Sequence, residues 1–311
     1  MGGYNKINLV ADLDPAMAVR DQELGERMRV HPKMFPAGPP DFGWAVQVGR
    51  EWRIGGAGGT CPDAARRGLA AHLRRTADQL PGSQEKRVRE MFAVAGKLDP
   101  EEGEQLAKDE WEIGDKRFRI IRVEKYTLIG NGVLEPPRHT DTDPPEAALP
   151  LKGHPIDPLV PAGYWEAQLR MNLCSYEPIP GTVPEQIQVE ARHAVRTHPS
   201  VITLPPEFTV VEIEDGRSNP ITGGNGPEQA RRSLANYFGD LLPRVREFKG
   251  DPASPAELAR WRRVAAWIEQ NPGPQWDVMG RRFRTVRVSR FLRLGRDGPE
   301  SPRPSDAVYF T

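Results

Sequence analysis

Cysteine, long hydrophobic runs and an N-terminal leader are scarce or missing in this sequence. Only two cysteines, Cys61 and Cys174, occur among the 311 residues, and they lie far apart. This argues against a disulfide framework and against a zinc site built from paired cysteines. No run of residues approaches the length of a membrane span, and the first residues lack the apolar core of a signal peptide. We therefore expect a cytoplasmic protein that does not enter a membrane.

An excess of one charge is missing too. The chain has 43 basic and 43 acidic residues and a formal net charge of +0. Residues 243–311 contain 14 basic and 8 acidic side chains, so only the C-terminal part is modestly basic. A domain that binds DNA usually has a larger excess and a recognisable motif, and neither is present here. What the sequence does contain is turn-forming residues, with 32 prolines and 30 glycines, which predict many short elements.

Two parts of the chain resemble each other. Residues 111–141 and 276–306 align without a gap at an offset of 165, and 11 of the 31 positions are identical. The Gly-rich segments 58–73 and 223–238 pair at the same offset. Similarity at a fixed period indicates an internal duplication.

The two copies predict the same order of elements: helix, β-hairpin, helix, helix and a second β-hairpin. Helices are indicated by i, i+4, i+8 apolar stripes with proline near their starts, and hairpins by alternating segments around glycine-containing turns. We expect an α+β fold in which two halves pack as an intrachain pseudo-dimer. The predicted boundaries are 1–141 for the first repeat, 142–163 for a proline-rich linker and 164–311 for the second repeat.

A family resemblance follows from the most similar part of the two copies. The pattern W-x-[IV]-x-x-[KR]-R-F-R-x-[IV]-R-V, followed by glycine and a Glu-x-Pro-Arg-x-[ST]-Asp tail, resembles an uncharacterised family of streptomycetes and related actinobacteria. That family is known as a domain of unknown function. The resemblance implies a cytoplasmic actinobacterial protein and no established activity.

Arginine is concentrated in the second copy, with seven arginines between residues 281 and 296. We assign the residues that both copies share to the fold, since both copies need the fold. An arginine among apolar neighbours needs a carboxylate or a carbonyl, and Glu135, Glu300, Asp141 and Asp306 are the candidate carboxylates. The residues assigned to structure are Trp111, Trp276, Arg117, Arg119, Arg122, Arg282, Arg284 and Arg287.

Arginines found only in the second copy are the candidates for binding an anionic partner. These are Arg290, Arg293 and Arg296, with Arg260 and Arg263 on the preceding helix. If they serve binding, changing the first three to serine leaves stability almost unaffected.

Two further motifs predict structure rather than chemistry. The Gly-rich turns end in Pro62 and Pro227, which remove a backbone donor that a phosphate would need, so we expect plain helix starts. His139, Asp141 and Asp143 alternate as metal ligands could, but the second copy loses two of them, and we expect a solvated loop. No metal and no cofactor is predicted.

Three functions remain open. The first is a non-enzymatic interaction or regulatory protein with an unknown protein or anionic partner. The second is a small-molecule binder or an enzyme that uses a groove between the halves, although no catalytic motif is recognisable. The third is a nucleic-acid binder that uses the C-terminal arginine-rich strand. A pocket with converging titratable groups favours the second, and salt-sensitive nucleic-acid affinity the third.

Overall fold

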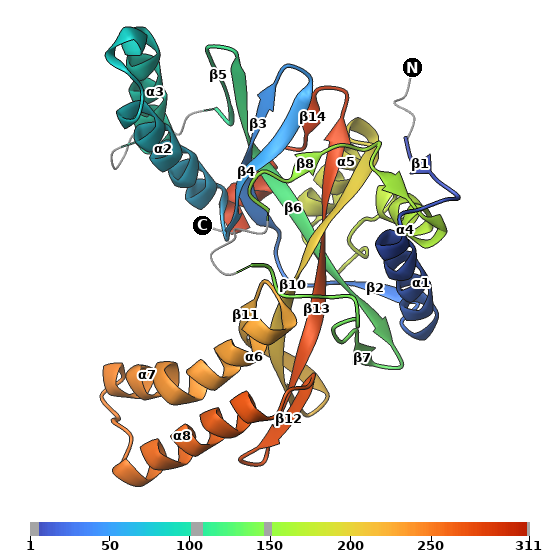
Figure 1. The fold of residues 1–311 in the computed structure, drawn as a ribbon, viewed down its shortest axis with the longest axis vertical. Coiled ribbons are helices and arrows are strands. Elements are labelled where there is room, and N and C mark those ends of the chain that lie inside the picture. The colour runs from blue at the N-terminus through green and yellow to red at the C-terminus, as the bar shows by residue number, and fades with distance from the viewer. Residues whose placement is uncertain (1–5, 101–107, 146–150, 310–311) are drawn as a thin grey trace.

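The protein is a mixed α and β structure with one large antiparallel sheet (Figure 1). The computed structural model describes residues 6–100, 108–145 and 151–309. Neighbouring strands follow the order β11-β10-β13-β6-β3-β4-β8, and shorter strands pair with β6 and β13 outside this path. The strands of the large sheet are β2 (Lys33–Pro36), β3 (Asp41–Val48), β4 (Glu51–Gly59), β5 (Glu110–Ile113), β6 (Lys116–Gly130), β7 (Val133–Leu134), β8 (Pro155–Ile156), β10 (Ser200–Glu214), β11 (Arg217–Gly224), β12 (Gln275–Val278), β13 (Arg281–Gly295) and β14 (Gly298–Pro299).

Helices pack against the sheet and extend at its two ends. Two further strands, β1 (Asn8–Leu9) and β9 (Pro161–Ala162), form a separate parallel pair. Among the described residues, no helix combines the length and the apolar character needed to cross a membrane. The helices are α1 (Pro15–Val30), α2 (Pro62–Asp78), a 3-10 turn (Gly82–Gln84), α3 (Glu85–Leu98), α4 (Tyr164–Cys174), α5 (Glu185–Thr197), α6 (Pro227–Asn236), a π-helical turn (Tyr237–Leu241), α7 (Leu242–Phe248), α8 (Pro255–Gln270) and α9 (Pro304–Tyr309).

The core consists of four apolar clusters. One joins α2 and α3 to β3 and β6 around Leu69 and Phe118. Another joins α6 and α8 to β10 and β13 around Phe238 and Phe283. The other two clusters lie against the middle strands: one combines side chains of β4, β6, β10 and β13, and one packs α1 and α4 against β6 and β13. Helices α2, α3, α6 and α8 therefore bury their apolar side chains in clusters that they share with the sheet.

The two long strands meet at the centre of the sheet. Strand β6 pairs with β13 through Tyr126 with Ser289, Lys125 with Arg290, and Glu124 with Phe291. Along the main path of the sheet, each predicted half contributes three strands, β6-β3-β4 from the first and β11-β10-β13 from the second.

Two local features were not expected from sequence. The segment 142–163, expected to be a proline-rich linker, contains β8 and β9 in its described part, and these strands pair with β4 and β1. Helix α4 was not predicted, since its apolar residues occur on most sides of the helix. The pairing of β3 with β6 has no register shift, so Arg122 lies on the same face of β6 as Phe118, as simple alternation predicts.

Candidate functional site

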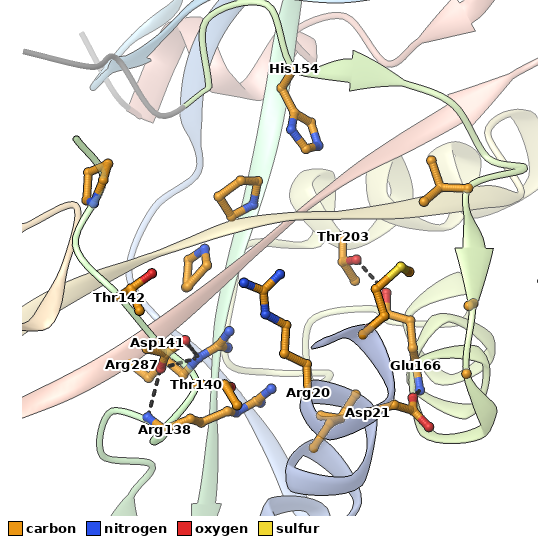
Figure 2. A pocket seen from close by; sticks show the side chains of 18 of the residues that line it. Arg20, Asp21, Arg138, Thr140, Asp141, Thr142, His154, Glu166, Thr203 and Arg287 are labelled. Carbon is orange, nitrogen blue, oxygen red and sulfur yellow. Dashed lines mark hydrogen bonds and ion pairs between the residues drawn. The ribbon is translucent and has the colours of Figure 1, made fainter. Parts of the chain in front are cut away.

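A cavity of about 660 Å³ lies where α1, α4, β10 and the loop after β7 meet (Figure 2). We call it the Arg20 pocket. Its apolar walls include Met17 and Leu24 of α1 and five prolines. Its polar lining comes from α1, α4, β13, the loop 138–145 and the segment 154–163, so both predicted halves and the predicted linker contribute. The prolines are Pro144, Pro145, Pro161, Pro205 and Pro206.

Pro205 and Pro206 of β10 line the pocket at a point where the strand is irregular. Proline has no N–H to donate to a ladder, and the pairing of β10 with β13 shifts register between Leu204 and Glu207, where Pro205 and Pro206 lie. The Arg290 guanidinium donates to the carbonyl oxygen of Pro205 at 2.7 and 2.9 Å and to that of Pro206 at 3.3 Å. Arg290 also contacts the Glu207 carboxylate at 3.3 Å. It therefore satisfies the carbonyls that the irregular strand leaves unpaired.

Most charged side chains of the pocket neutralise one another. Arg287 bonds to Asp141 at 3.0 Å, and Arg170 bonds to Glu166 at 2.9 Å. Arg138 bonds at 2.7 Å to Glu135, which lies just behind the lining. These pairs are shielded from solvent, and they fix the walls of the pocket rather than offering free charge to a ligand.

Two carboxylates of the lining bind helix N-termini. Asp21 accepts hydrogen bonds from the backbone N–H groups of Trp165 and Glu166 at the start of α4. Asp143 accepts from Glu228 and Gln229 at the start of α6, at 2.9 and 2.8 Å. Helix N-termini attract anions because their N–H groups and the helix dipole point at the same place. In α6 this place is taken by a carboxylate of the protein itself.

Glycine is required at both helix starts. A side-chain carbon added to Gly163 would lie 2.3 Å from the Asp21 carboxyl carbon, and one added to Gly226 would lie 2.2 Å from the Asp143 carboxylate. In the second Gly-rich turn, Gly226 therefore lets the Asp143 carboxylate come close to the start of α6. The turn leads directly into this helix, as expected. The alternating motif around it is not a solvated loop. Asp141 and Asp143 are bound within the fold, and His139 contacts Glu23 at 3.2 Å while its ring stays exposed.

Arg20 differs from the other charged residues of the pocket. It is exposed on α1, and among the described residues its guanidinium has no ion pair and no hydrogen bond. Figure 2 shows it projecting toward the middle of the view, with Asp141 and Arg287 on one side and Glu166 and Thr203 on the other. His154 lies nearby, and burial, followed by the charge of Arg290, lowers its pKa below the ordinary value. This shift favours the uncharged form of the histidine, whereas Arg20 carries a charge that has no partner among the described residues.

Two of the predicted binding arginines lie inside the protein. Arg290 is 4% exposed and Arg293 is 1% exposed. The Arg293 guanidinium donates to the carbonyl oxygens of Leu173, Cys174 and Tyr176, at and just after the C-terminal end of α4. An arginine in this position binds the carbonyls that a helix end leaves unpaired. The expectation that these two residues contact a partner without supporting the fold does not fit this placement.

The other three predicted binding arginines are exposed but not together. Arg296 lies in the turn between β13 and β14, beside the turn between β3 and β4. Arg260 and Arg263 are exposed on α8, at the opposite end of the sheet (Figure 1). The structure therefore does not join them into a single basic surface.

Of the arginines assigned to structure, four are buried or partly buried and bind carboxylates, and two have weaker contacts nearer the surface. Arg119 and Arg122 are 5% exposed, and Arg287 is partly buried; all three bind carboxylates. Arg117 is partly buried and pairs with Glu110 and Asp297. Arg282 is exposed beside Asp277, and Arg284 is partly buried and bonds to the amide oxygen of Gln275.

The two tryptophans also differ. Trp276 is 2% exposed, whereas Trp111 is only partly buried at the edge of its cluster. Each indole N–H donates at 2.9 Å to a backbone carbonyl, of Asn271 and Lys108 respectively.

Arg20 and the proline walls were not predicted from the sequence. Arg20 lies in a segment that was predicted to be a helix from its length and its prolines, and nothing in the pattern of α1 separates it from other surface arginines. A signal was present in Pro205-Pro206, because two prolines inside an alternating strand pattern indicate a bulge.

Within the part of the chain that the structure describes, no group of three or more His, Cys, Asp or Glu residues could hold a metal ion.

Comparisons with known proteins give a family but no function. No curated protein and no solved structure matches the chain. A family model described as "Family of unknown function (DUF5954)" matches residues 14–308, nearly the whole sequence. The chain therefore belongs to the DUF5954 family.

Proposed function

We propose that this protein is a non-enzymatic binding protein whose Arg20 pocket takes a small molecule with one carboxylate and an apolar body. The observation that carries the proposal is the Arg20 guanidinium, which faces the pocket without a partner among the described residues. Arginine presents a planar fork of N–H donors that matches the two oxygens of a carboxylate.

The charge balance of the pocket favours a single negative charge. Asp21 and Asp143 are compensated by helix N-termini, and the other lining acids and arginines are paired. Arg20 remains without a carboxylate partner among the described residues, so a ligand with one carboxylate can pair with it. A ligand with several negative charges would meet the acids of the walls without further cations to offset them.

The shape and chemistry of the walls favour an apolar body. A volume of about 660 Å³ lies in the range of small-molecule pockets, which are mostly apolar with a few placed polar groups. Proline rings are rigid, so walls made of them lose little conformational entropy when a ligand binds.

The test uses 4-phenylbutyrate, a carboxylate on an apolar body, which competes with the fluorescent anion 8-anilinonaphthalene-1-sulfonate. We expect both to bind the wild type and Arg20→Ala to weaken phenylbutyrate by about tenfold or more, the effect of one lost charge-assisted contact. The control is Arg67→Ala, which removes an exposed arginine from α2 outside the pocket. Circular dichroism checks that both variants are folded. Equal affinity in Arg20→Ala and wild type, or no binding by the wild type, contradicts the proposal.

We also propose that the chain is an internal duplication whose halves, 1–141 and 164–311, form a pseudo-dimer. The pairing of β6 with β13 supports this. At the offset of 165, Tyr126 corresponds to Phe291 and Glu124 to Ser289, so exchanging the two halves turns the pair Tyr126–Ser289 into the pair Phe291–Glu124. Such an exchange is what a two-fold axis between the halves would produce. The contacts of the tails are reciprocal in the same way. Arg122 bonds to Asp306, and Arg287 bonds to Asp141.

The remaining expectations stay predictions. They are a cytoplasmic location, an actinobacterial source and a regulatory role exerted through a partner. A nucleic-acid partner is the least supported, because two arginines of the predicted basic strand are enclosed in the fold.

A further inference from the structure

A second pocket, of about 890 Å³, lies at the turn between β13 and β14. Its lining combines the N-terminal segment, the turn between β3 and β4, the start of β10 and the segment after β8. Three of its cations, Lys6, Arg50 and Arg296, are exposed and have no ion pair among the described residues. We call it the Arg296 pocket. It is separate from the Arg20 pocket, although residues 154–161 contribute to both.

The turn that presents Arg296 is fixed in place. Gly298 has a φ of +119°, and a side-chain carbon there would lie 2.8 Å from the Trp52 ring, so only glycine allows this approach. Asp297 bonds to Arg117 at 2.7 and 2.9 Å and to Arg119 at 2.8 Å. These contacts hold the turn against the first half of the sheet, so the backbone at Arg296 is fixed at the pocket that Arg50 also lines.

The charge of this pocket is strongly positive. Asp297 is the acidic residue of its lining, and its carboxylate is already bound by Arg117 and Arg119. Arg117, which also faces the pocket, is matched by Glu110 outside it. Three positive charges are therefore left for a ligand, whereas the Arg20 pocket has one.

The floor of the pocket is apolar. Trp52, Ile156 and Leu294 are almost fully buried beneath it, and Pro158 and Pro199 line its sides. A ligand that fits must carry several negative charges and also present an uncharged part to this floor. Phosphate esters of ring compounds combine both properties, and arginine and lysine are the residues that bind phosphate groups.

We propose that the Arg296 pocket binds a small organic phosphate with at least two negative charges. Lys6, Arg50 and Arg296 contact its phosphate groups, and its uncharged part rests on the floor around Trp52 and Leu294. This site does not depend on the function proposed for the Arg20 pocket.

Calorimetric titration tests the site with three probes: ATP, inorganic triphosphate and a 12-base-pair DNA duplex, at about 50 and 200 mM salt. We expect ATP to bind more tightly than inorganic triphosphate, because ATP alone has a part that contacts the apolar floor. We also expect duplex DNA to bind more weakly than ATP, because the pocket is limited in extent. Equal affinities for ATP and triphosphate, no binding of ATP at the lower salt concentration, or tighter binding of DNA than of ATP would each overturn the proposal.

The variant that removes the site is Arg50→Ser with Arg296→Ser, and its matched control is Arg260→Ser with Arg263→Ser. Both remove two exposed arginines that have no ion pair in the described part of the chain, and both change the net charge equally. We expect the first to weaken ATP by about tenfold or more and the control to leave it unchanged. Equal losses in the two variants indicate a general charge effect and overturn the proposal. Arg20→Ala should keep its ATP affinity, which separates this test from that of the Arg20 pocket.

Discussion

The two long strands β6 and β13 place arginines at matched positions, but their partners differ between the halves. Arg122 and Arg287 have equivalent contacts, since each binds an aspartate from the tail of the other half. Arg119 binds Glu110, Asp297 and the carbonyl of Pro299, whereas Arg284 at the matched position bonds, among the described residues, to the amide oxygen of Gln275. The same residue in the same strand position therefore binds two carboxylates in one half and a neutral amide in the other.

A second contrast concerns the positions that differ. Arg293 occupies the place of Leu128 in the first half, and it binds the carbonyls at the end of α4. The described residues before α1, from residue 6 on, contain the strand β1 and no such helix. A residue found in one half only can therefore serve a structural element found in that half only, and need not mark a binding site.

The largest expected effect is the loss of the enclosed pair Arg122–Asp306. Arg122→Met leaves Asp306 and Glu124 without their shared cation, and breaking such a pair costs about 3–5 kcal/mol of unfolding free energy. Arg287→Met should lose less, roughly 2 kcal/mol, because the Arg287–Asp141 pair is more exposed. Urea denaturation measures both variants. Equal losses would show that the two reciprocal contacts contribute alike despite the difference in burial.

The next effect separates Arg293 from Arg296. Arg293→Ser removes three hydrogen bonds to carbonyls at the end of α4, and we expect a loss of about 2–3 kcal/mol. Arg296→Ser changes an exposed residue without a partner among the described ones and should stay within about 0.5 kcal/mol of wild type. Thermal unfolding of the two variants decides this. Melting of Arg293→Ser at the wild-type temperature would restore the original interpretation of Arg293 as a binding residue.

A smaller difference is expected between Arg119 and Arg284. Arg119→Ser leaves the Glu110 and Asp297 carboxylates without their buried partner and should destabilise by about 2 kcal/mol. Arg284→Ser loses one exposed hydrogen bond and should destabilise by less than about 0.5 kcal/mol. The same urea titration compares them. A larger loss for Arg284 would mean that the matched strands are not stabilised by the partners named here.

The smallest effect concerns the contact of each tail with a helix of its own half, α1 in the first half and α5 in the second. Burial alone would raise the pKa of Glu23, but hydrogen bonds from Thr140 and His139 outweigh it and lower the pKa to about 2. A depressed folded-state pKa stabilises above the unfolded value of 4.5, and this contribution disappears as the pH falls from 4.5 to about 2.

Glu23→Gln should reduce the loss of unfolding free energy between pH 4.5 and about 2 by about 1 kcal/mol. The measurement is stability by urea denaturation at a series of pH values, with Glu190→Gln as the counterpart, since Glu190 receives the backbone N–H and hydroxyl of Ser305 in the second half. An unchanged pH profile in Glu23→Gln would contradict the assignment.

The sequence predicted the elements better than their contacts. The hairpins, the paired helices and the arginine strands follow from local periodicity, since proline, glycine and alternating apolar residues act over a few positions. Helix α4 was missed because its apolar residues do not form one stripe. Asp141 and Asp306 were named as partners for the arginines, but which half each would reach depends on how the two halves pack.

The candidate sites depend even more on tertiary structure. Whether Arg20, Arg293 or Arg296 is free depends on residues more than 100 positions away, such as the end of α4 for Arg293. Spacing along the chain carries no information on such contacts. The prolines of β10 were the one local feature that indicated an irregular strand beside the pocket.

The most direct test of the Arg20 pocket is a crystal structure of the protein with 4-phenylbutyrate. We predict that the carboxylate oxygens lie within hydrogen-bond distance of the Arg20 guanidinium and that the phenyl ring contacts Pro205 and Pro206. An empty Arg20 pocket at a saturating concentration of the ligand, or a ligand bound there with its carboxylate away from Arg20, would contradict the proposed function.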